Sequence, residues 1–239
     1  MLDKYIYLIG GIVFLVMAGM FYIVRSDLRK LALRIAGLGA VAAFMEPIFT
    51  RDYWLPPVVL GSSRLAVEDF LFCIGITVAG GLVYPVIMCR KFSSRQYRSG
   101  AQLYIAFVLA TVIGFGVLNI WLGVNSVLLN SIFLLVYTFI IWVLRRDLIK
   151  PSLIAAGIAL VFIVTLYALF FNVWAPEWWA HHWLLDGTSL GVTVLGNIPV
   201  TELAWYAAWF LFATASYPFV EGVTYITKAN KQSSATQAL

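Results

Sequence analysis

The chain alternates between long apolar runs and shorter polar connectors. An α-helix needs about 20 residues, rising about 1.5 Å each, to cross the hydrocarbon core of a bilayer. Seven runs are about that long, at 5–24, 31–49, 66–89, 102–121, 124–144, 152–173 and 199–226. The pattern therefore predicts an all-α integral membrane protein with seven transmembrane helices and almost no room for a soluble domain.

The composition supports this class, because 62% of the residues are hydrophobic and only 11% are charged. Soluble domains carry about 25% charged residues. The net charge of +5 comes from basic residues at the ends of the apolar runs, where such residues contact anionic lipid headgroups. Membrane lipid is therefore an expected partner, and nucleic acid is not. Basic residues follow the first run instead of preceding it, so we do not expect a cleaved signal peptide.

Basic residues are distributed unevenly between the two predicted sides of the membrane. Thirteen of the sixteen lie on one side, at Arg25, Arg29, Lys30, Arg34, Arg90, Lys91, Arg95, Arg98, Arg145, Arg146, Lys150, Lys228 and Lys231. The other side holds Lys4, Arg51 and Arg64. Because basic loops stay in the cytoplasm, we predict an outer N-terminus, a cytoplasmic C-terminus and a multi-pass protein of the plasma membrane.

Acidic residues show the opposite bias. Eight lie at or near the outer side, at Asp3, Glu46, Asp52, Glu68, Asp69, Glu177, Asp186 and Glu202. Acids contribute little to topology, so this bias requires another explanation. One is helix capping, since carboxylates are favourable in the first turn of a helix. Another is a site, since acids within membrane helices are costly and usually face an interior cavity.

An internal repeat connects two of these acids. A shift of 133 positions places Asp69 over Glu202, each in the first turn of a predicted helix. Asp52 and Asp186 precede them in the corresponding outer loops. Substrate sites of repeat-built membrane proteins lie between the halves. We predict one membrane domain, 1–239, with parallel three-helix repeats at 1–100 and 123–228, a connecting helix 4 at 101–122 and a polar tail at 229–239.

The residues after the two acids indicate what such a site would do. Glu202 is followed at i+3, i+4 and i+7 by Trp205, Tyr206 and Trp209, which share its helix face. Asp69 is followed at i+3 by Phe72. An aromatic stripe is typical of helix packing, yet a carboxyl group above aromatic rings also suits carbocation chemistry. The acid supplies a proton, and the ring faces stabilise the cation.

At these residues the sequence resembles the lycopene cyclase domain family, which comprises small, two-repeat membrane carotenoid cyclases. Halves of that family carry a loop with Asp and Trp, then Pro-x-Glu-Glu leading into Leu-Phe-Phe. Here "RDYW", with Asp52 and Trp54, precedes "AVEDFLF". In the second half Asp186 precedes "PVTELAW". Ala66 and Thr201 depart from the family motif.

The resemblance implies a redox-neutral cyclisation of the end group of a lycopene-type isoprenoid polyene, with neither a cofactor nor a metal ion. Its hydrophobic carotenoid substrate would enter from the bilayer. The catalytic candidates are Glu202, Glu68, Asp69, Asp52 and Asp186. The candidates for substrate binding are Trp205, Tyr206, Trp209, Phe72 and Trp54.

Other classes remain open at this point. Gly and Pro pairs near mid-membrane, as at Gly80-Gly81, allow a small parallel-repeat transporter, and a non-catalytic isoprenoid- or lipid-binding protein is a third alternative. A retinal protein is excluded by the absence of a lysine within 199–226. Glu177 and His181 have metal-pair spacing without a third ligand, and their tryptophan-rich stretch is better explained as an interfacial segment or a lid. The sequence leaves a homo-oligomer open.

Overall fold

The computed structural model describes residues 3–62 and 65–227. Arg64, Lys228, Lys231 and the predicted tail at 229–239 lie outside the described residues. The α-helices are α1 (Ile6–Val24), α2 (Arg29–Ala42), α3 (Glu46–Asp52), α4 (Val67–Ile87), α5 (Ala101–Gly114), α6 (Ser126–Leu144), α7 (Ile149–Ala168), α8 (Trp178–His182) and α9 (Val200–Glu221). Short strand pairs are β1 (Gly61–Ser62) with β2 (Leu65–Ala66), β3 (Lys91–Phe92) with β6 (Tyr225–Ile226), and β4 (Thr193–Val194) with β5 (Ile198–Pro199).

The prediction of seven long apolar helices is confirmed. By length and composition, the segments able to cross a membrane are Ile6–Val24, Ser26–Asp52, Val67–Ile87, Ala101–Trp121, Ser126–Leu144, Arg146–Trp174 and Val200–Glu221. The second and sixth are longer than predicted. The second adds the 3-10 turn Ser26–Leu28, the first residues of α2 and the end of α3, and the sixth adds the 3-10 turn Arg146–Leu148 and the first residues of α7. The charged residues at the ends of these two runs, such as Arg29 and Asp52, are therefore part of the helical segments and not of the connectors.

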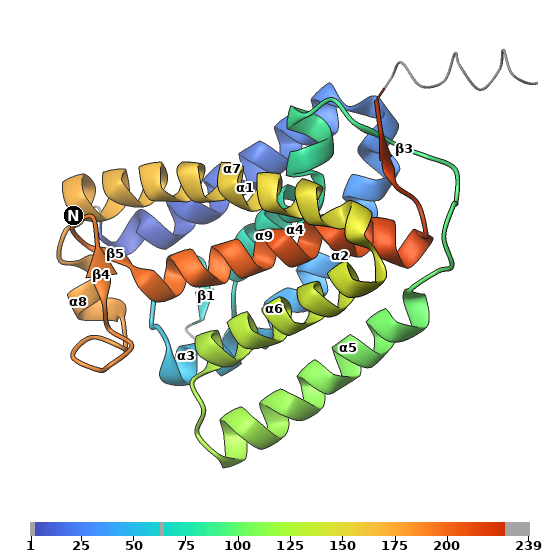
Figure 1. The fold of residues 1–239 in the computed structure, drawn as a ribbon. Coiled ribbons are helices and arrows are strands. Elements are labelled where there is room, and N and C mark those ends of the chain that lie inside the picture. The colour runs from blue at the N-terminus through green and yellow to red at the C-terminus, as the bar shows by residue number, and fades with distance from the viewer. Residues whose placement is uncertain (1–2, 63–64, 228–239) are drawn as a thin grey trace, which may run out of the picture.

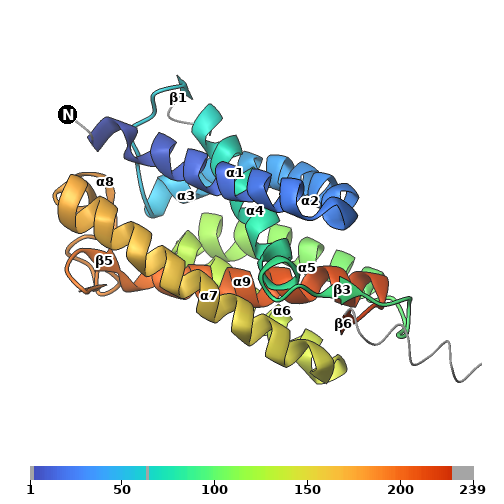
Figure 2. The same cartoon turned by 90° about the horizontal axis from the view of Figure 1, so that it is seen from above.

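The helices form two groups that meet along α4 and α9 (Figures 1 and 2). In the first group, α1 and α2 pack against α4. In the second, α6 and α7 pack against α9, while α5 stands at the edge of the molecule. Close packing depends on glycine: a Cβ atom at Gly75 would lie 2.6 Å from Cβ of Phe14 on α1, and one at Gly39 would lie 2.9 Å from Cα of Ile74. Small residues at these positions let helix backbones approach one another.

An arginine in the turn after α1 fixes the end of α4. Arg25 donates two hydrogen bonds of 2.8 Å to the carboxylate of Asp27. Its other donors reach the backbone oxygen of Pro85 and, at 2.7 Å, that of Arg90. The last carbonyl groups of a helix have no partner within the helix, and a cation is favourable at that end. Arg25 therefore satisfies both requirements for α4.

The turn after α6 makes the same contacts with α9. Arg145 donates two bonds of 2.8 Å to Asp147, and reaches the backbone oxygens of Pro218 at 3.3 Å and Val223 at 2.7 Å. The arginines and aspartates are 120 positions apart, and the accepting carbonyls are 133 apart. The arginine–aspartate turns, Arg25–Asp27 and Arg145–Asp147, thus hold the corresponding ends of the two central helices.

Short strand pairs lie at both ends of α4 and α9. The hairpin β1–β2 leads directly into α4, and the hairpin β4–β5 leads directly into α9. At the opposite ends, β3 and β6 pair the segments that follow α4 and α9. Both central helices therefore begin directly after a hairpin at one end of the bundle. At the opposite end of the bundle, the segments that follow them are paired with each other.

Candidate active site

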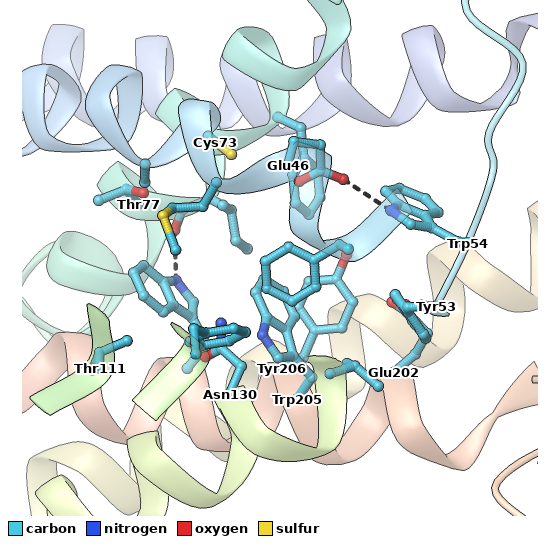
Figure 3. Close-up of a pocket in the computed structure, with 18 of the residues that line it drawn as sticks. Glu46, Tyr53, Trp54, Cys73, Thr77, Thr111, Asn130, Glu202, Trp205 and Tyr206 are labelled. Carbon is cyan, nitrogen blue, oxygen red and sulfur yellow. Dashed lines mark hydrogen bonds between the residues drawn. The ribbon is translucent and has the colours of Figure 1, made fainter. Parts of the chain in front are cut away.

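A pocket lies where the two helix groups meet, near the first turns of α4 and α9 (Figure 3). It encloses about 180 Å³, and most of its lining is apolar and aromatic. Two carboxyl groups line it, Glu46 from the start of α3 and Glu202 from the first turn of α9. We call this cavity the first pocket.

Glu202 is held in place by a tyrosine from α7. The Tyr167 hydroxyl donates a 2.6 Å hydrogen bond to Oε2 of Glu202, and it lies 3.1 Å from the hydroxyl of Tyr206. Glu202 is 6% exposed. Within the described residues, no hydrogen bond reaches its other oxygen, Oε1, which leaves that atom for a molecule in the pocket. Sequence reasoning identified Glu202 but gave no role to Tyr167, which is far from it in the chain.

Glu46 is the second carboxyl of the first pocket. It is 8% exposed, and Nε1 of Trp54 donates a 2.8 Å hydrogen bond to its Oε1. The site prediction omitted Glu46 because no motif surrounds it. A signal was nevertheless present: the residue lies inside the apolar run 31–49, and an acid within a membrane helix usually faces the interior.

All five predicted substrate-binding residues line the first pocket: Phe72, Trp54, Trp205, Tyr206 and Trp209. The rings of Trp205 and Trp209 are stacked, with centroids 6.2 Å apart and planes 7° from parallel. Phe72 stacks on Trp205 from α4, with centroids 6.3 Å apart. Phe72, Trp205, Tyr206 and Trp209 therefore form an aromatic wall beside the two carboxyls.

Asp69 lies one side chain away from the first pocket. Its Oδ1 accepts a 2.6 Å hydrogen bond from the hydroxyl of Tyr7, and its Oδ2 accepts one of 2.7 Å from the backbone N–H of Ala66. The second bond caps the start of α4. The Tyr7 ring contacts Trp54 edge-on, with centroids 4.8 Å apart. Glu202 lines the first pocket and Asp69 does not, so the expectation that both acids face one cavity is not met; Asp69 is connected to Trp54 of the pocket only through the Tyr7 ring.

Two further predicted acids hold loop segments in place. Glu68 is fully buried, and its Oε1 accepts hydrogen bonds from the N–H groups of Val59 and Leu60 at 2.7 and 2.8 Å. Asp52 accepts bonds from the side chains of Asn119 and Ser126, at 2.6 and 2.5 Å. Neither acid lines the first pocket, because Glu68 orders the loop before α4 and Asp52 ties α3 to the connection between α5 and α6.

The connector 174–198 also differs from expectation. Asp186 is exposed and does not line the first pocket. Trp178, Trp179 and Trp183 are at least 96% buried, so these three rings pack inside the protein and do not form an exposed apolar face. They form an aromatic cluster with Phe171 and Tyr167. Backbone hydrogen bonds join this connector to Tyr53 and Leu55, which places α8 against the segment that carries Trp54.

In the part of the chain that the structure describes, no three His, Cys, Asp or Glu side chains are grouped as ligands for a metal ion. Polar atoms without a partner there include the hydroxyl of Tyr53 and Nε1 of Trp205, both on residues that line the first pocket. The site thus offers carboxyl groups, unpaired donors and aromatic faces.

Fold and site together define a multi-pass membrane protein with two buried carboxyl groups and an aromatic wall in a pocket between its helix groups. The lycopene cyclase family model matches residues 125–220. The matched segment contains Tyr167, Glu202 and three residues of the aromatic wall, and in this part the chain is similar to the lycopene cyclase family. No curated protein and no solved structure matches the chain significantly. The family domain supports a carotenoid cyclase-like function.

Proposed function

We propose that the protein cyclises the end group of a lycopene-type polyene within the bilayer of the plasma membrane. The observation that carries the proposal is the placement of Glu46 and Glu202 in one aromatic pocket. The family domain over 125–220 supports the same reaction class. A cyclisation of this kind needs an acid, a base and a surface that tolerates positive charge, and the first pocket contains all three.

The reaction is a proton-initiated ring closure that changes no oxidation state. One carboxyl donates a proton to the terminal double bond, which leaves a tertiary carbocation. The neighbouring double bond supplies the electron pair that closes the ring and moves the charge into it. The second carboxyl removes a proton from the ring, and a new double bond forms. One proton enters and one leaves, so the pocket needs only two carboxyls in opposite protonation states.

The other pocket residues support these steps. Tyr167 fixes one oxygen of Glu202, and Trp54 fixes one oxygen of Glu46, so each carboxyl keeps the geometry that proton transfer requires. The faces of Trp205 and Trp209 attract a cation through their negative π-surfaces. Glu46 and Glu202 are buried among apolar side chains, which limits the access of bulk water that would otherwise capture the carbocation.

We also propose the parallel arrangement of two repeats, 1–100 and 123–228, around a connecting helix, with an outer N-terminus. The duplicated arginine–aspartate turns and the hairpins before α4 and α9 support the repeat. The distribution of basic residues supports the orientation. In this arrangement the first pocket lies between the repeats and toward the outer leaflet.

Solvent deuterium incorporation tests the proposed chemistry. Purified protein in lipid nanodiscs is incubated with the acyclic polyene in D₂O, and the products are examined by mass spectrometry. We expect one deuterium for each ring formed, because the carboxyl that donates the proton exchanges with solvent between turnovers. A cyclised product without deuterium would contradict initiation by an exchangeable acid. Retention of bound polyene without any product would favour the binding-protein alternative.

A further inference from the structure

A second pocket, of about 240 Å³, lies deeper along α9. Its lining comes from α2, α4, α5 and α9 and includes Thr77 and Trp209, which also line the first pocket. Cavities that share two lining residues are adjacent. Trp209 and Thr77 therefore stand between the two pockets, which follow one another along α9 from Glu202 toward the opposite end of the bundle.

The length of the combined space is set by α9. Its lining begins at Glu202 in the first turn of α9 and reaches Glu221 at the last residue of that helix. These positions are 19 residues apart, which corresponds to about 28 Å along a helix. The hydrocarbon core of a bilayer is about 30 Å thick. An occupant of both pockets would therefore span almost the whole core.

The character of the lining changes along this length. Next to Trp209, the second pocket is lined by apolar side chains from α2 and α9, such as Ile35, Leu38 and Phe212. Its far end is lined by Arg34, Tyr217 and Glu221. The carboxyls of the first pocket and these polar residues therefore bracket an apolar channel. A single acyl chain of one leaflet reaches only half of the core, whereas a linear C40-type polyene fits the full length.

We propose that the second pocket holds the chain of the polyene whose end group lies in the first pocket. This inference rests on the proposed cyclase function and adds to it the part of the protein that holds the polyene chain and selects its length. The chain passes Thr77 and Trp209, follows α9, and places its far end beside Arg34 and Glu221. Length selection then resides in the second pocket and chemistry in the first.

Filling the second pocket from its rim tests the inference. Leu38→Trp adds bulk at a lining position of α2 where the leucine is 61% exposed, so the substitution does not disturb the core. Leu33→Trp is the matched control, because Leu33 lies on the same helix, is also 61% exposed and lines neither the first nor the second pocket. Ser216→Phe, on α9, fills the channel from the opposite side.

The variants are assayed with two substrates that share one end group, a full-length polyene and a polyene of less than half its length. We expect Leu38→Trp and Ser216→Phe to lower kcat/KM for the long substrate by about tenfold or more. Each new side chain occupies space in the second pocket, so the polyene chain can no longer bury its apolar surface there. For the short substrate the loss should stay within about twofold, and Leu33→Trp should match wild type with both. No loss with the long substrate, or equal losses with both, would overturn the inference.

Equilibrium binding separates this inference from the proposed chemistry. Retention of the long polyene by purified protein in nanodiscs is measured by its absorbance, whether or not product forms. Weaker retention by Leu38→Trp than by Leu33→Trp, by about tenfold or more, would support the channel even for a protein that cyclises nothing. Equal retention by both variants, or a co-purified lipid that the polyene does not displace, would overturn it.

Discussion

At the scale of single residues, the account depends on which acids reach the substrate. The sequence contains many outer-side acids, and helix spacing alone connected Glu202 with its aromatic neighbours. The structure separates that set by partner: Glu68 and Asp52 bind backbone and loop groups, whereas Glu46 and Glu202 line the first pocket. Acids on the same predicted side of the membrane therefore have different roles, and their hydrogen-bond partners distinguish them.

Glu202→Gln should abolish most activity while preserving the fold. Glutamine keeps the shape and an oxygen that accepts the Tyr167 hydrogen bond, but it cannot donate or accept the catalytic proton. Removal of one acid–base group costs on the order of 10²–10⁴ in rate, and kcat of the purified variant measures this. If Glu202 only caps α9, the change should cost about 1 kcal/mol of stability or less and leave kcat unaltered.

Glu46→Gln should lose activity to a similar extent, although no motif marks this residue. Asp186→Asn is the matched comparison, because Asp186 was also a predicted site acid but is exposed and does not line the first pocket. We expect Asp186→Asn to keep activity within about twofold of wild type, as surface substitutions usually do. Activity is measured at equal amounts of folded protein. A larger loss for Asp186→Asn than for Glu46→Gln would contradict the assignment of Glu46 to the site.

Tyr167→Phe should lower kcat more than it raises KM. The substitution removes the hydrogen bond to Oε2 of Glu202 but leaves an apolar ring of nearly the same shape in the pocket. The loss of a hydrogen bond to a charged or ionisable group is worth about 1.5–3 kcal/mol, or roughly ten- to a hundredfold in rate. Steady-state kinetics separate the two parameters. A change confined to KM would mean that Tyr167 contacts substrate instead of positioning Glu202.

At the scale of elements, the apolar runs predicted the helices well, because nothing except a membrane span requires such long uninterrupted hydrophobicity. The ends were less predictable. The predicted second run began at residue 31, because the basic residues before it interrupt the apolar pattern. In the structure these basic residues belong to the same helical segment, Ser26–Asp52. The arginine–aspartate turns were visible as "RSDL" and "RRDL", but their basic residues were used only to orient the chain. Their hydrogen bonds to the ends of α4 and α9 depend on tertiary packing.

Arg145→Ala should destabilise the protein more than Arg25→Ala. Both arginines make equivalent bonds, but the side chain of Arg145 is 4% exposed and that of Arg25 is 14% exposed. Breaking a buried pair costs about 3–5 kcal/mol, and solvent screening reduces the cost for the more exposed pair. Thermal unfolding in detergent provides the measurement. A larger loss for Arg25→Ala would contradict the assigned order.

At the scale of the whole molecule, the site comes from helices that are distant in sequence. Spacing within α9 identified Glu202, Trp205, Tyr206 and Trp209, since residues on one helix face can be read from a period of 3.6. Glu46 and Tyr167 come from other helices, and no local pattern brings them to Glu202. Their contributions follow from the packing of α3 and α7 around α9, which the sequence pattern does not specify.

The orientation of the molecule is a prediction at this scale. The thirteen basic residues on one side predict that the C-terminus is cytoplasmic. Fusions of a periplasm-active and a cytoplasm-active reporter to the C-terminus should give activity only for the cytoplasmic one. Activity of the periplasmic reporter alone would place the first pocket on the cytoplasmic side and contradict the proposed arrangement.

The most direct test of the central claim is the pigment profile of a lycopene-accumulating host that expresses the protein. Wild type is compared with the double variant Glu46→Gln/Glu202→Gln at equal amounts of membrane-inserted protein, and the extracted pigments are separated by chromatography. The account predicts monocyclic or bicyclic product with wild type and unchanged lycopene with the double variant. Unchanged lycopene with wild type, or the same cyclised products with both, would contradict it.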